Sequence, residues 1–402
     1  MELAPEKPRV LLGVTGGIAA FKAAELASLL VQQGAEVRVV MSEAARRFVG
    51  PLTFAALTGH PVPGDWFDAQ QEAAIGHIEL ARWAQVVVVA PATANFIAKA
   101  AVGLADELLC ALLLATTAPV VIAPAMNPQM FAHFTVAENL ARLRARGVRV
   151  AGPAQGRTAC GEEGPGRMLE AAAVAEAVWR LLSPQDLAGV NLLVTAGPTR
   201  EHLDPVRYIS NPSTGRMGIE IARAALRRGA KVCLVLGPSH LEPPAQVEAV
   251  RVTSAEDMAR EVLARAPQQQ VIIKAAAVSD FRPADRQPQK VKKSGPAGAC
   301  TLEATPDILA ALGKKKKGQV LVGFAAETEQ VLKHAAAKLK AKNLDLIVAN
   351  DVSAADAGFA VATNRVHFLT PEGEVESLPL MSKLEVAQRL LDRVVRLLGN
   401  AS

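Results

Sequence analysis

The sequence predicts an α/β protein with two Rossmann-like domains, each built on a parallel sheet. The 402 residues are 50% hydrophobic and only 21% charged, which is enough apolar material for two or three domain cores. A buried strand, a glycine-rich turn, a helix and a second strand follow one another in residues 10–41, and the same order returns in residues 192–236. Strands that alternate with helices in this way form parallel sheets.

The first half begins with the apolar run Val10–Val14, which predicts a buried strand because no polar residue interrupts it. A glycine-rich turn follows, then a helical stretch from Ile18 to Gln33 and a strand that ends at Met41. The other elements expected here are strands at Gln85–Ala90 and Pro119–Ala123, helices at Ala94–Ala101, Glu107–Ala115 and Val136–Arg146, and a mobile glycine-rich loop at Ala154–Arg167.

The second half begins in the same way, with a strand at Leu192–Thr195, a helix from about Gly218 to Arg228 and a strand at Gly229–Leu236. Ser183 and Pro184 end the preceding helix, and we place the domain boundary near Ala188, between domains 1–188 and 189–402. The remaining elements expected are strands at Val271–Ala275, Val320–Phe324 and Leu344–Ala349, helices at Ala255–Ala266 and Glu327–Ala341, and a mobile loop at Gln287–Ala299.

Hydropathy and cysteine spacing exclude several classes of protein. No segment reaches the roughly 18 to 20 uninterrupted apolar residues that a membrane span needs. The first residues lack the apolar core of a signal peptide, so we expect a cytoplasmic protein with no membrane partner. The four cysteines lie far apart without C-x-x-C spacing, which argues against a disulfide framework and a structural zinc site.

The net charge of +5 is unevenly divided along the chain. Residues 1–188 contain 15 basic and 17 acidic residues, so the remainder has a net charge of +7. Such a modest excess suits phosphate-bearing ligands as readily as nucleic acid. A basic nucleic-acid-binding protein is therefore one alternative, but aromatic stacking residues are scarce and we expect no nucleic-acid partner. We interpret Lys314–Lys317 as a solvated turn.

The two glycine-rich turns do not match a dinucleotide site. Such a site needs G-x-G-x-x-G and an acidic residue at the end of the second strand. The first half has Ser42 there, with Glu43 one position late, and the second half has Gly237. A nicotinamide oxidoreductase is therefore the disfavoured alternative. The first turn instead offers hydroxyl groups and unobstructed N–H groups beside the start of a helix, which suit a terminal phosphate. These groups belong to Thr15, Gly16, Gly17 and Ser42. A tight turn that binds no ligand is the alternative.

Thr93 and Asn95 closely follow the strand Gln85–Ala90, where parallel sheets place ligand-binding loops. Plain helix capping explains the two residues equally well.

Five segments of the first half resemble the flavin-dependent cysteine decarboxylases of coenzyme A biosynthesis, in the family's order. They are Thr15–Lys22, His77–Ala81, Ala90–Asn95, Pro124–Met130 and Ala159–Met168. Two positions depart from the family pattern: Phe131 stands where Trp is usual, and Phe21 where Tyr is common. Both keep an aromatic ring.

The second half resembles the CTP-dependent phosphopantothenate–cysteine ligases. The matching segments are Thr195–Glu201, Asp204–Asn211, Ser213–Gly218, Ala275–Asp280 and Lys290–Lys293. The whole chain thus resembles the bacterial bifunctional decarboxylase and ligase that makes 4′-phosphopantothenoylcysteine and then decarboxylates it. The resemblance implies a flavodoxin-like decarboxylase domain that binds FMN, a nucleotide-dependent ligase domain that uses CTP with Mg2+, and a homo-oligomer with the flavin between subunits.

Loss of CO2 from a cysteine carboxylate leaves electrons with nowhere to delocalise, so a cofactor must supply the electron sink. The resemblance implies that His77 is the base, that Asn127 hydrogen-bonds the substrate carboxylate and that Cys160 is the acid. Taken alone, each has a plainer explanation: a structural histidine, a helix cap before Pro128 and a buried thiol. The residues expected to bind FMN are Thr15, Gly16, Gly17, Ser42, Thr93 and Asn95.

Joining a carboxylate to an amine requires activation, which a nucleotidyl mixed anhydride provides while lysines and Mg2+ stabilise the phosphate charge. The resemblance implies that Asn211 steadies the acyl-nucleotide intermediate and that Lys290 closes onto the reacting groups. The CTP contacts that it implies are Lys274, Ala275, Ala276, Asp280, Lys290, Pro306, Asp307, Ile308, Leu309, Phe324, Lys338 and Lys342. Lys338 and Lys342 are one helical turn apart, so both can reach one phosphate chain; a solvated basic face is the alternative.

Overall fold

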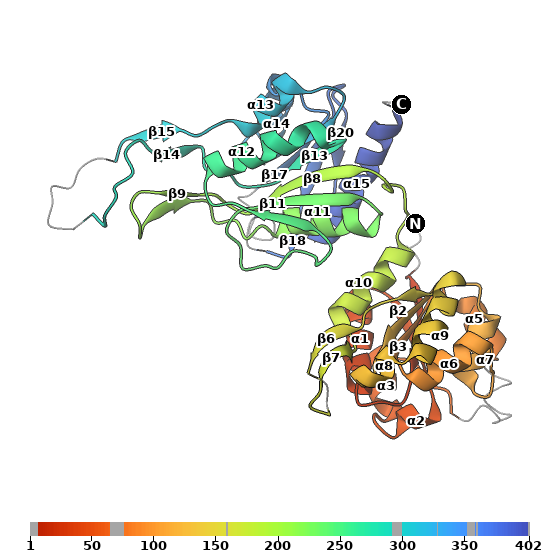
Figure 1. The fold of residues 1–402 in the computed structure, drawn as a ribbon. Coiled ribbons are helices and arrows are strands. Elements are labelled where there is room, and N and C mark those ends of the chain that lie inside the picture. The colour runs from red at the N-terminus through yellow and green to blue at the C-terminus, as the bar shows by residue number, and fades with distance from the viewer. Residues whose placement is uncertain are drawn as a thin grey trace. The chain divides into compact units, whose positions relative to one another are not determined.

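The computed structural model describes residues 7–64, 76–157, 160–291, 300–327, 329–351, 358 and 361–400. The chain folds into two compact units, Met1–Ser183 and Pro184–Ser402, which run from red to yellow and from green to blue in Figure 1. Ala188, near which we expect the domain boundary, lies a few residues inside the second unit.

A five-stranded parallel sheet forms the centre of the N-terminal unit. Its strands lie in the order β2-β1-β3-β4-β5, which is the order of flavodoxin-like folds. The strands are β1 (Arg9–Val14), β2 (Glu36–Met41), β3 (Val86–Ala92), β4 (Val120–Pro124) and β5 (Arg149–Val150), with a hairpin of β6 (Ala154–Arg157) and β7 (Glu163–Arg167). The helices are α1 (Ala20–Gln32), α2 (Glu43–Arg46), α3 (Pro51–Thr58), α5 (His77–Trp83), α6 (Ala94–Val102), α7 (Leu108–Ala115), α8 (Pro128–Ala132), α9 (Phe134–Ala145) and α10 (Ala171–Leu182).

Alternate residues of the central strand β1 pack into two separate cores. Val10 and Leu12 lie with residues of α1 and α10, whereas Leu11 lies with residues of α6 and α7. All three side chains are fully buried. Because successive side chains of a strand point to opposite faces, a strand covered by helices on both sides needs an unbroken apolar run.

An eight-stranded sheet forms the centre of the C-terminal unit, in the order β12-β11-β8-β13-β16-β17-β19-β20. Its first six strands are parallel and follow the Rossmann order, and the last two are antiparallel additions. They are β8 (Asn191–Ala196), β11 (Lys231–Leu236), β12 (Glu248–Arg251), β13 (Val271–Lys274), β16 (Val320–Glu327), β17 (Leu346–Asp351), β19 (Val366–Leu369) and β20 (Val375–Ser377). The α/β prediction with two parallel-sheet domains is confirmed.

Helices α11 (Arg216–Arg227) and α15 (Lys383–Asn400) cover one face of this sheet, and α12 (Ala255–Arg265), α13 (Ile308–Lys315) and α14 (Val331–Ala341) cover the other. A single 3-10 turn, Ala266–Gln268, follows α12. Three short strand pairs complete the unit: β9 (Arg200–His202) with β10 (Tyr208–Ser210), β14 (Phe281–Pro283) with β15 (Leu302–Ala304), and β18 (Thr363–Asn364) with β21 (Met381–Ser382). Figure 1 shows β9, β14 and β15 extending away from the eight-stranded sheet.

The predicted loop Ala154–Arg167 is wrong, because most of it forms the β6–β7 hairpin; residues 158–159 lie outside the described part. Its glycines permit a close backbone approach. The Gly166 carbonyl accepts a 2.9 Å hydrogen bond from the Met126 N–H, and a Cβ on Gly166 would lie 2.4 Å from the Met126 carbonyl oxygen. Glycine is therefore required here by packing and does not mark an unstructured loop.

Two further expectations in the second half need correction. The predicted helix Glu327–Ala341 begins only at Val331, because Glu327 continues β16 and pairs with Asp351 of β17. In the predicted turn Lys314–Lys317, the first two lysines belong to α13, and Lys316 forms a 2.6 Å ion pair with Asp345. Residues 292–299 of the predicted loop Gln287–Ala299 and residue 328 lie outside the described part.

Among the described residues, no helix is both long and apolar enough to cross a membrane.

Gly218 allows α11 to pack directly on β8, since an added Cβ would lie 2.5 Å from Ala196 Cβ and 2.8 Å from the Thr195 carbonyl oxygen. We expect Gly218→Ala to lower the free energy of unfolding of the C-terminal unit by about 1–3 kcal/mol, measured by urea denaturation. Gly399→Ala is the control, because its Cβ would meet nothing within 4 Å. Equal stability of the two variants would contradict this packing.

Candidate functional site

A cavity of about 950 Å3 opens in the N-terminal unit at the carboxyl ends of its parallel strands. Thr15, Ser42 and Thr93 directly follow β1, β2 and β3, and the segment after β4 completes the rim. The strand order changes direction between β1 and β3, which is where open α/β sheets bind ligands. All six residues expected to bind FMN line this cavity: Thr15, Gly16, Gly17, Ser42, Thr93 and Asn95.

Two hydroxyl groups of this set are committed to the fold. Thr15 Oγ1 donates to the Pro91 carbonyl at 2.7 Å and accepts from the Thr93 N–H at 3.1 Å. Ser42 Oγ accepts from the Ala45 N–H at 3.2 Å and caps α2. Because a hydroxyl group has one proton, Thr15 Oγ1 has none left to donate to a phosphate. In this structure the hydroxyl group joins two loops, and the expected role of Thr15 in binding FMN stays a prediction.

The remaining residues of the set leave backbone and small polar groups at the cavity. A Cβ on Gly16 would lie 2.3 Å from Ala44 Cβ, so only glycine permits this close approach of the turn to α2. Thr93 is the N-cap of α6 and accepts from the Phe96 N–H at 3.4 Å, so its explanation as a helix cap is correct. Capping does not remove Thr93 from the cavity wall.

Asn127 and Cys160 lie in the same cavity wall. Asn127 caps α8, with Oδ1 accepting from the Gln129 N–H at 2.8 Å, so the helix-cap explanation is also correct. Its Nδ2 donates to Glu162 Oε2 at 2.8 Å. Asn127 thus already binds a carboxylate in this structure. Cys160 is exposed, in the turn between β6 and β7.

His77 is the first residue of α5, directly after residues 65–75, which lie outside the described part. It is not among the described residues that line the cavity. The structure of one chain therefore brings Asn127 and Cys160 together but does not bring His77 to them.

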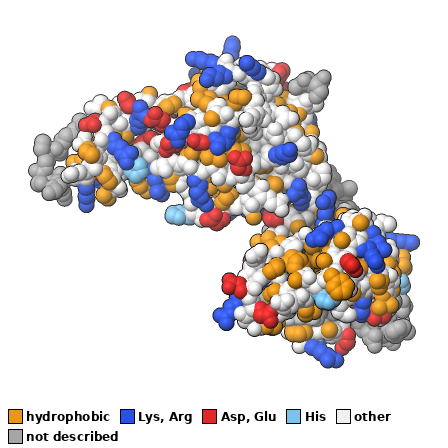
Figure 2. All heavy atoms as spheres, viewed as in Figure 1, with side chains coloured by type: hydrophobic (Ala, Val, Ile, Leu, Met, Phe, Trp, Pro, Cys, Tyr) orange, Lys and Arg blue, Asp and Glu red, His pale blue; other side chains and the backbone are white. Residues whose placement is uncertain are grey.

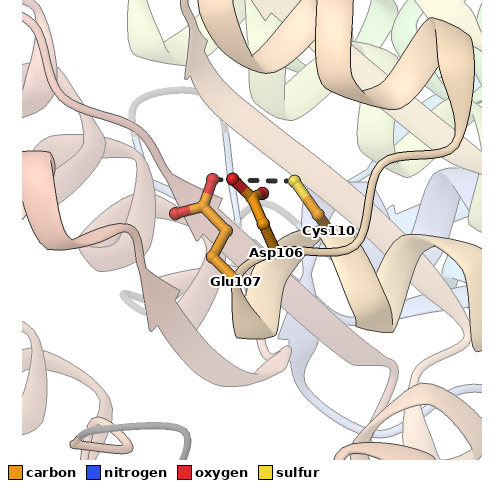
Figure 3. Close-up of side chains that lie close together, drawn as sticks. All are labelled: Asp106, Glu107 and Cys110. Atoms are coloured by element: carbon orange, nitrogen blue, oxygen red, sulfur yellow. Dashed lines mark hydrogen bonds between the residues drawn. The ribbon is translucent and has the colours of Figure 1, made fainter.

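Three potential metal ligands that the sequence did not single out lie at the edge of this unit's cavity. Carboxylate oxygens of Asp106 and Glu107 and the Cys110 thiol lie within 4.8 Å of one another (Figure 3). Lys99 Nζ lies 2.9 Å from Asp106 and 3.6 Å from Glu107, so its single positive charge offsets part of their negative charge. Burial, and then the Glu107 charge, raises the pKa of the Cys110 thiol to about 12, so it stays protonated. This combination does not favour a cation.

A second cavity, of about 320 Å3, lies in the C-terminal unit at the carboxyl ends of β13, β16 and β17, beside the start of α11. The residues expected to act in ligation that line it are Asn211, Lys274, Ala275, Ala276, Asp280, Phe324 and Lys338. Asn211 Nδ2 donates to the carbonyl oxygens of Ala277 at 3.1 Å and Val278 at 3.2 Å, which joins the end of β10 to the loop after β13.

Three lysines converge at this cavity. Burial, then the nearby charges of Lys338 and Lys342, lowers the pKa of Lys274 to about 8. The pKa of Lys338 is also lowered, by burial and by Lys342, and its Nζ donates to the Phe324 carbonyl at 3.1 Å. Like charges held this close favour an anionic ligand. The prediction that Lys338 and Lys342 form only a solvated basic face does not fit Lys338, which is partly buried.

The other expected CTP contacts are not among the described residues that line this cavity. Asp307 caps α13 through the Ala310 N–H and pairs with Lys342 at 2.9 Å. Ile308 and Leu309 are each 2% exposed and pack in the core, so only their backbone groups are available to a ligand. Pro306 and Lys290 are exposed. Residues 292–293 of the Lys290–Lys293 motif and residue 159 of the Ala159–Met168 motif lie outside the described part.

Sequence reasoning missed five polar residues of this cavity: Ser213, Arg216, Asn350, Asn364 and Lys383. Lys383 is 3% exposed, and its Nζ donates to the Gly358 carbonyl at 2.8 Å. Burial and the charge of Arg216 lower the pKa of Lys383 to about 8. Arg216 lies inside the recognised segment Ser213–Gly218, but Lys383 begins a distant helix, and no local pattern marks it as a cavity residue.

Two protein-family models match almost the whole chain. The model "Flavoprotein" matches residues 2–183, and the model "DNA/pantothenate metabolism flavoprotein C-terminal domain" matches residues 187–398. The chain is 45% identical over 395 residues to the "Coenzyme A biosynthesis bifunctional protein CoaBC" of Vibrio vulnificus (strain YJ016), covering 98% of both chains. It is 46% identical over 400 residues to the protein of the same name from Escherichia coli (strain K12), again covering 98% of both.

Among solved structures, the chain is similar to the C-terminal domain of a coenzyme A biosynthesis bifunctional protein CoaBC. That likeness has 42% identity and a TM-score of 0.47, and it covers 54% of this chain and 99% of the other. The two family matches and the full-length relatives agree on both halves. The chain therefore belongs to the family of the coenzyme A biosynthesis bifunctional proteins CoaBC.

Proposed function

We propose that the chain ligates L-cysteine to 4′-phosphopantothenate with CTP in domain 189–402 and decarboxylates the product to 4′-phosphopantetheine with FMN in domain 1–188. The observation that supports this most directly is the grouping of site residues. Asn127, Cys160 and all six residues expected to bind FMN line one cavity, and two of the lysines expected to bind CTP, Lys274 and Lys338, line another.

The first cavity suits a flavin. Its volume of about 950 Å3 lies at the upper end of the range for cofactor sites, and the approach of Gly16 to Ala44 leaves the turn without a side chain at the cavity mouth. Bound FMN supplies the electron sink that decarboxylation requires. Asn127 Nδ2 is the donor for the substrate carboxylate, in the place where it now holds Glu162. An amide bears no charge, so it orients the carboxylate without opposing the loss of CO2.

Cys160 is the acid that returns a proton to the substrate after CO2 has left. Its exposed turn reaches the cavity from the β6–β7 hairpin. His77 acts as the base from a neighbouring copy of the chain, which explains its absence from the cavity lining of one copy. Exposed apolar side chains at the cavity, Ile18 (63%) and Phe21 (59%), support a homo-oligomer, and Figure 2 shows hydrophobic side chains gathered on the visible face of this unit.

In the second cavity, Lys274, Lys338 and Lys342 bind the triphosphate together with Mg2+, and Lys290 and Asn211 act on the acyl-nucleotide. Burial, and then repulsion by nearby lysines, lowers the pKa of Lys274 and of Lys338, so the charged forms cost free energy in the ligand-free protein. An anionic nucleotide relieves this repulsion. On the face shown in Figure 2, the Lys and Arg side chains of this unit are interspersed with Asp and Glu.

Cys160→Ser should release CO2 but fail to return the proton, because a hydroxyl is a far weaker acid than a thiol. We expect an enethiol product two hydrogens lighter than 4′-phosphopantetheine, detected by mass spectrometry. His77→Asn should release no CO2. When His77→Asn and Cys160→Ser chains are co-expressed, decarboxylation should return if His77 of one copy and Cys160 of another copy form one site. Full reduction of the product by Cys160→Ser would remove Cys160 from the proposed mechanism.

Lys290→Ala should abolish ligation and leave decarboxylation of supplied 4′-phosphopantothenoylcysteine unchanged, because the two cavities belong to separate units. A mass-spectrometric assay with 4′-phosphopantothenate, cysteine, CTP and Mg2+ measures both steps. Lys290→Arg should rescue poorly, since a planar guanidinium does not replace a compact ammonium. Lys314→Ala, at an exposed lysine at the end of α13, is the control. Equal loss of both activities would refute the two-domain assignment.

CTP binding should take up protons near pH 8. The pKa of Lys274 is lowered to about 8, and a bound triphosphate raises it by favouring the charged ammonium. Uptake at this group should be about half a proton at pH 8, and CTP affinity should fall as the pH rises further. Calorimetry in two buffers of different ionisation enthalpy measures the uptake. Lys274→Arg stays charged and should show less uptake; equal uptake in both proteins would exclude Lys274 as its source.

A further inference from the structure

The carboxylate of Asp204 lies completely buried in the turn between β9 and β10, with no exposed side-chain area. It accepts hydrogen bonds from the N–H groups of Val206 and Arg207, both at 2.8 Å. The Arg207 guanidinium donates to its second oxygen through Nε at 2.9 Å and Nη2 at 2.5 Å. These bonds lower the pKa of Asp204 well below its usual range, so the group remains a carboxylate.

The same carboxylate reaches a segment far along the chain. Asp204 Oδ2 accepts from the Val291 N–H at 3.2 Å, and Arg207 Nη2 donates to the Val291 carbonyl at 3.0 Å. A third bond, from the Gln287 N–H to the Leu203 carbonyl at 2.9 Å, joins the same two segments. The segment 287–291 is therefore held at both ends by the β9–β10 turn, beside the extending strands in Figure 1.

Lys290 is the residue directly before Val291, and its side chain is exposed. A lysine side chain has about four rotatable bonds, so the position of its ammonium group depends strongly on where its backbone is held. Holding the backbone reduces the space that the ammonium samples and raises its concentration near a reacting group. A carboxylate placed only to stabilise the β9–β10 turn would be satisfied by Arg207 and the turn's own N–H groups, yet Asp204 also holds Val291.

We propose that Asp204 is a positioning residue for Lys290 and that it acts on ligation by holding the Val291 backbone. This inference rests on the proposed role of Lys290 in the ligase reaction. Asp204 itself contacts neither CTP nor the acyl group. Its negative charge is compensated by Arg207, so its effect on ligation passes through the position of segment 287–291.

Asp204→Asn tests the proposal in the full-length protein. The amide keeps the shape of the side chain but offers N–H groups to donors, so the bond from Val291 weakens. We expect kcat of ligation to fall by about 10- to 100-fold with little change in KM for CTP, and decarboxylation to stay unchanged. Amide hydrogen exchange should rise in segment 287–291. Glu303→Gln is the matched control, because it breaks an exposed ion pair with Arg282 in the neighbouring β14–β15 hairpin.

A double-mutant cycle separates positioning from a general loss of structure. In a Lys290→Gln background, the added Asp204→Asn change should alter the residual rate of ligation by less than about twofold, because the side chain that it positions is already gone. Independent, multiplicative losses would overturn the inference. Thermal unfolding reports whether Asp204→Asn is folded; if it is not, Asp204→Glu, which keeps the charge, takes its place in the same cycle.

The outcomes distinguish this inference from the proposed function. Full ligase activity of Lys290→Gln alone would refute the role of Lys290 on which both depend. If Lys290→Gln impairs ligation but the effects of Lys290→Gln and Asp204→Asn on the ligation rate multiply independently, only the positioning role of Asp204 would be refuted.

Discussion

The parallel pairing of buried strands determines where the candidate residues that follow these strands lie. In a parallel sheet all strands end at the same edge, so segments that are far apart in the chain come together there. Pairing of β1 with β2 and β3 brings residues 15, 42 and 93 to one cavity. Pairing of β13 with β8 and β16 brings Lys274 beside Phe324 in the other. Because helices cover both faces of each sheet, this edge is where polar groups can gather without entering a core.

The two cavities lie at the same edge of similar sheets but differ in size and in the groups that line them. The first is large and lined by glycines, by amide and hydroxyl groups and by charged side chains such as Lys22, Glu43 and Arg157, and several of the hydroxyl groups serve the fold by joining loops or capping helices. The second is smaller and is lined by Lys274 and Lys338, whose pKa is lowered by burial and by the charges of neighbouring lysines. The difference arises from the side chains after each strand and not from the strands.

Several glycines and asparagines at these cavities each have two structural roles. Gly16, Gly166 and Gly218 each lie where a Cβ would collide with a neighbouring segment, so they bring backbone groups close together. Asn127 and Asn211 each donate to another segment, to Glu162 and to the carbonyl oxygens of Ala277 and Val278. Such residues look like turn or cap residues in the sequence. Their second role depends on a partner that is distant in the chain.

The sequence by itself determined the α/β class and the two repeated strand–turn–helix beginnings, because buried strands and glycine turns leave local patterns. Its contiguous motifs also marked candidate residues that line each of the two cavities. Only the tertiary structure decided the rest. The β6–β7 hairpin depends on the contact of Gly166 with Met126, and the extension of β16 to Glu327 depends on pairing with β17. Lys383 reaches the ligase cavity through the packing of α15, and Asp204 holds Val291 across the β9–β10 turn. These are long-range contacts, and a linear pattern records only what neighbouring residues determine.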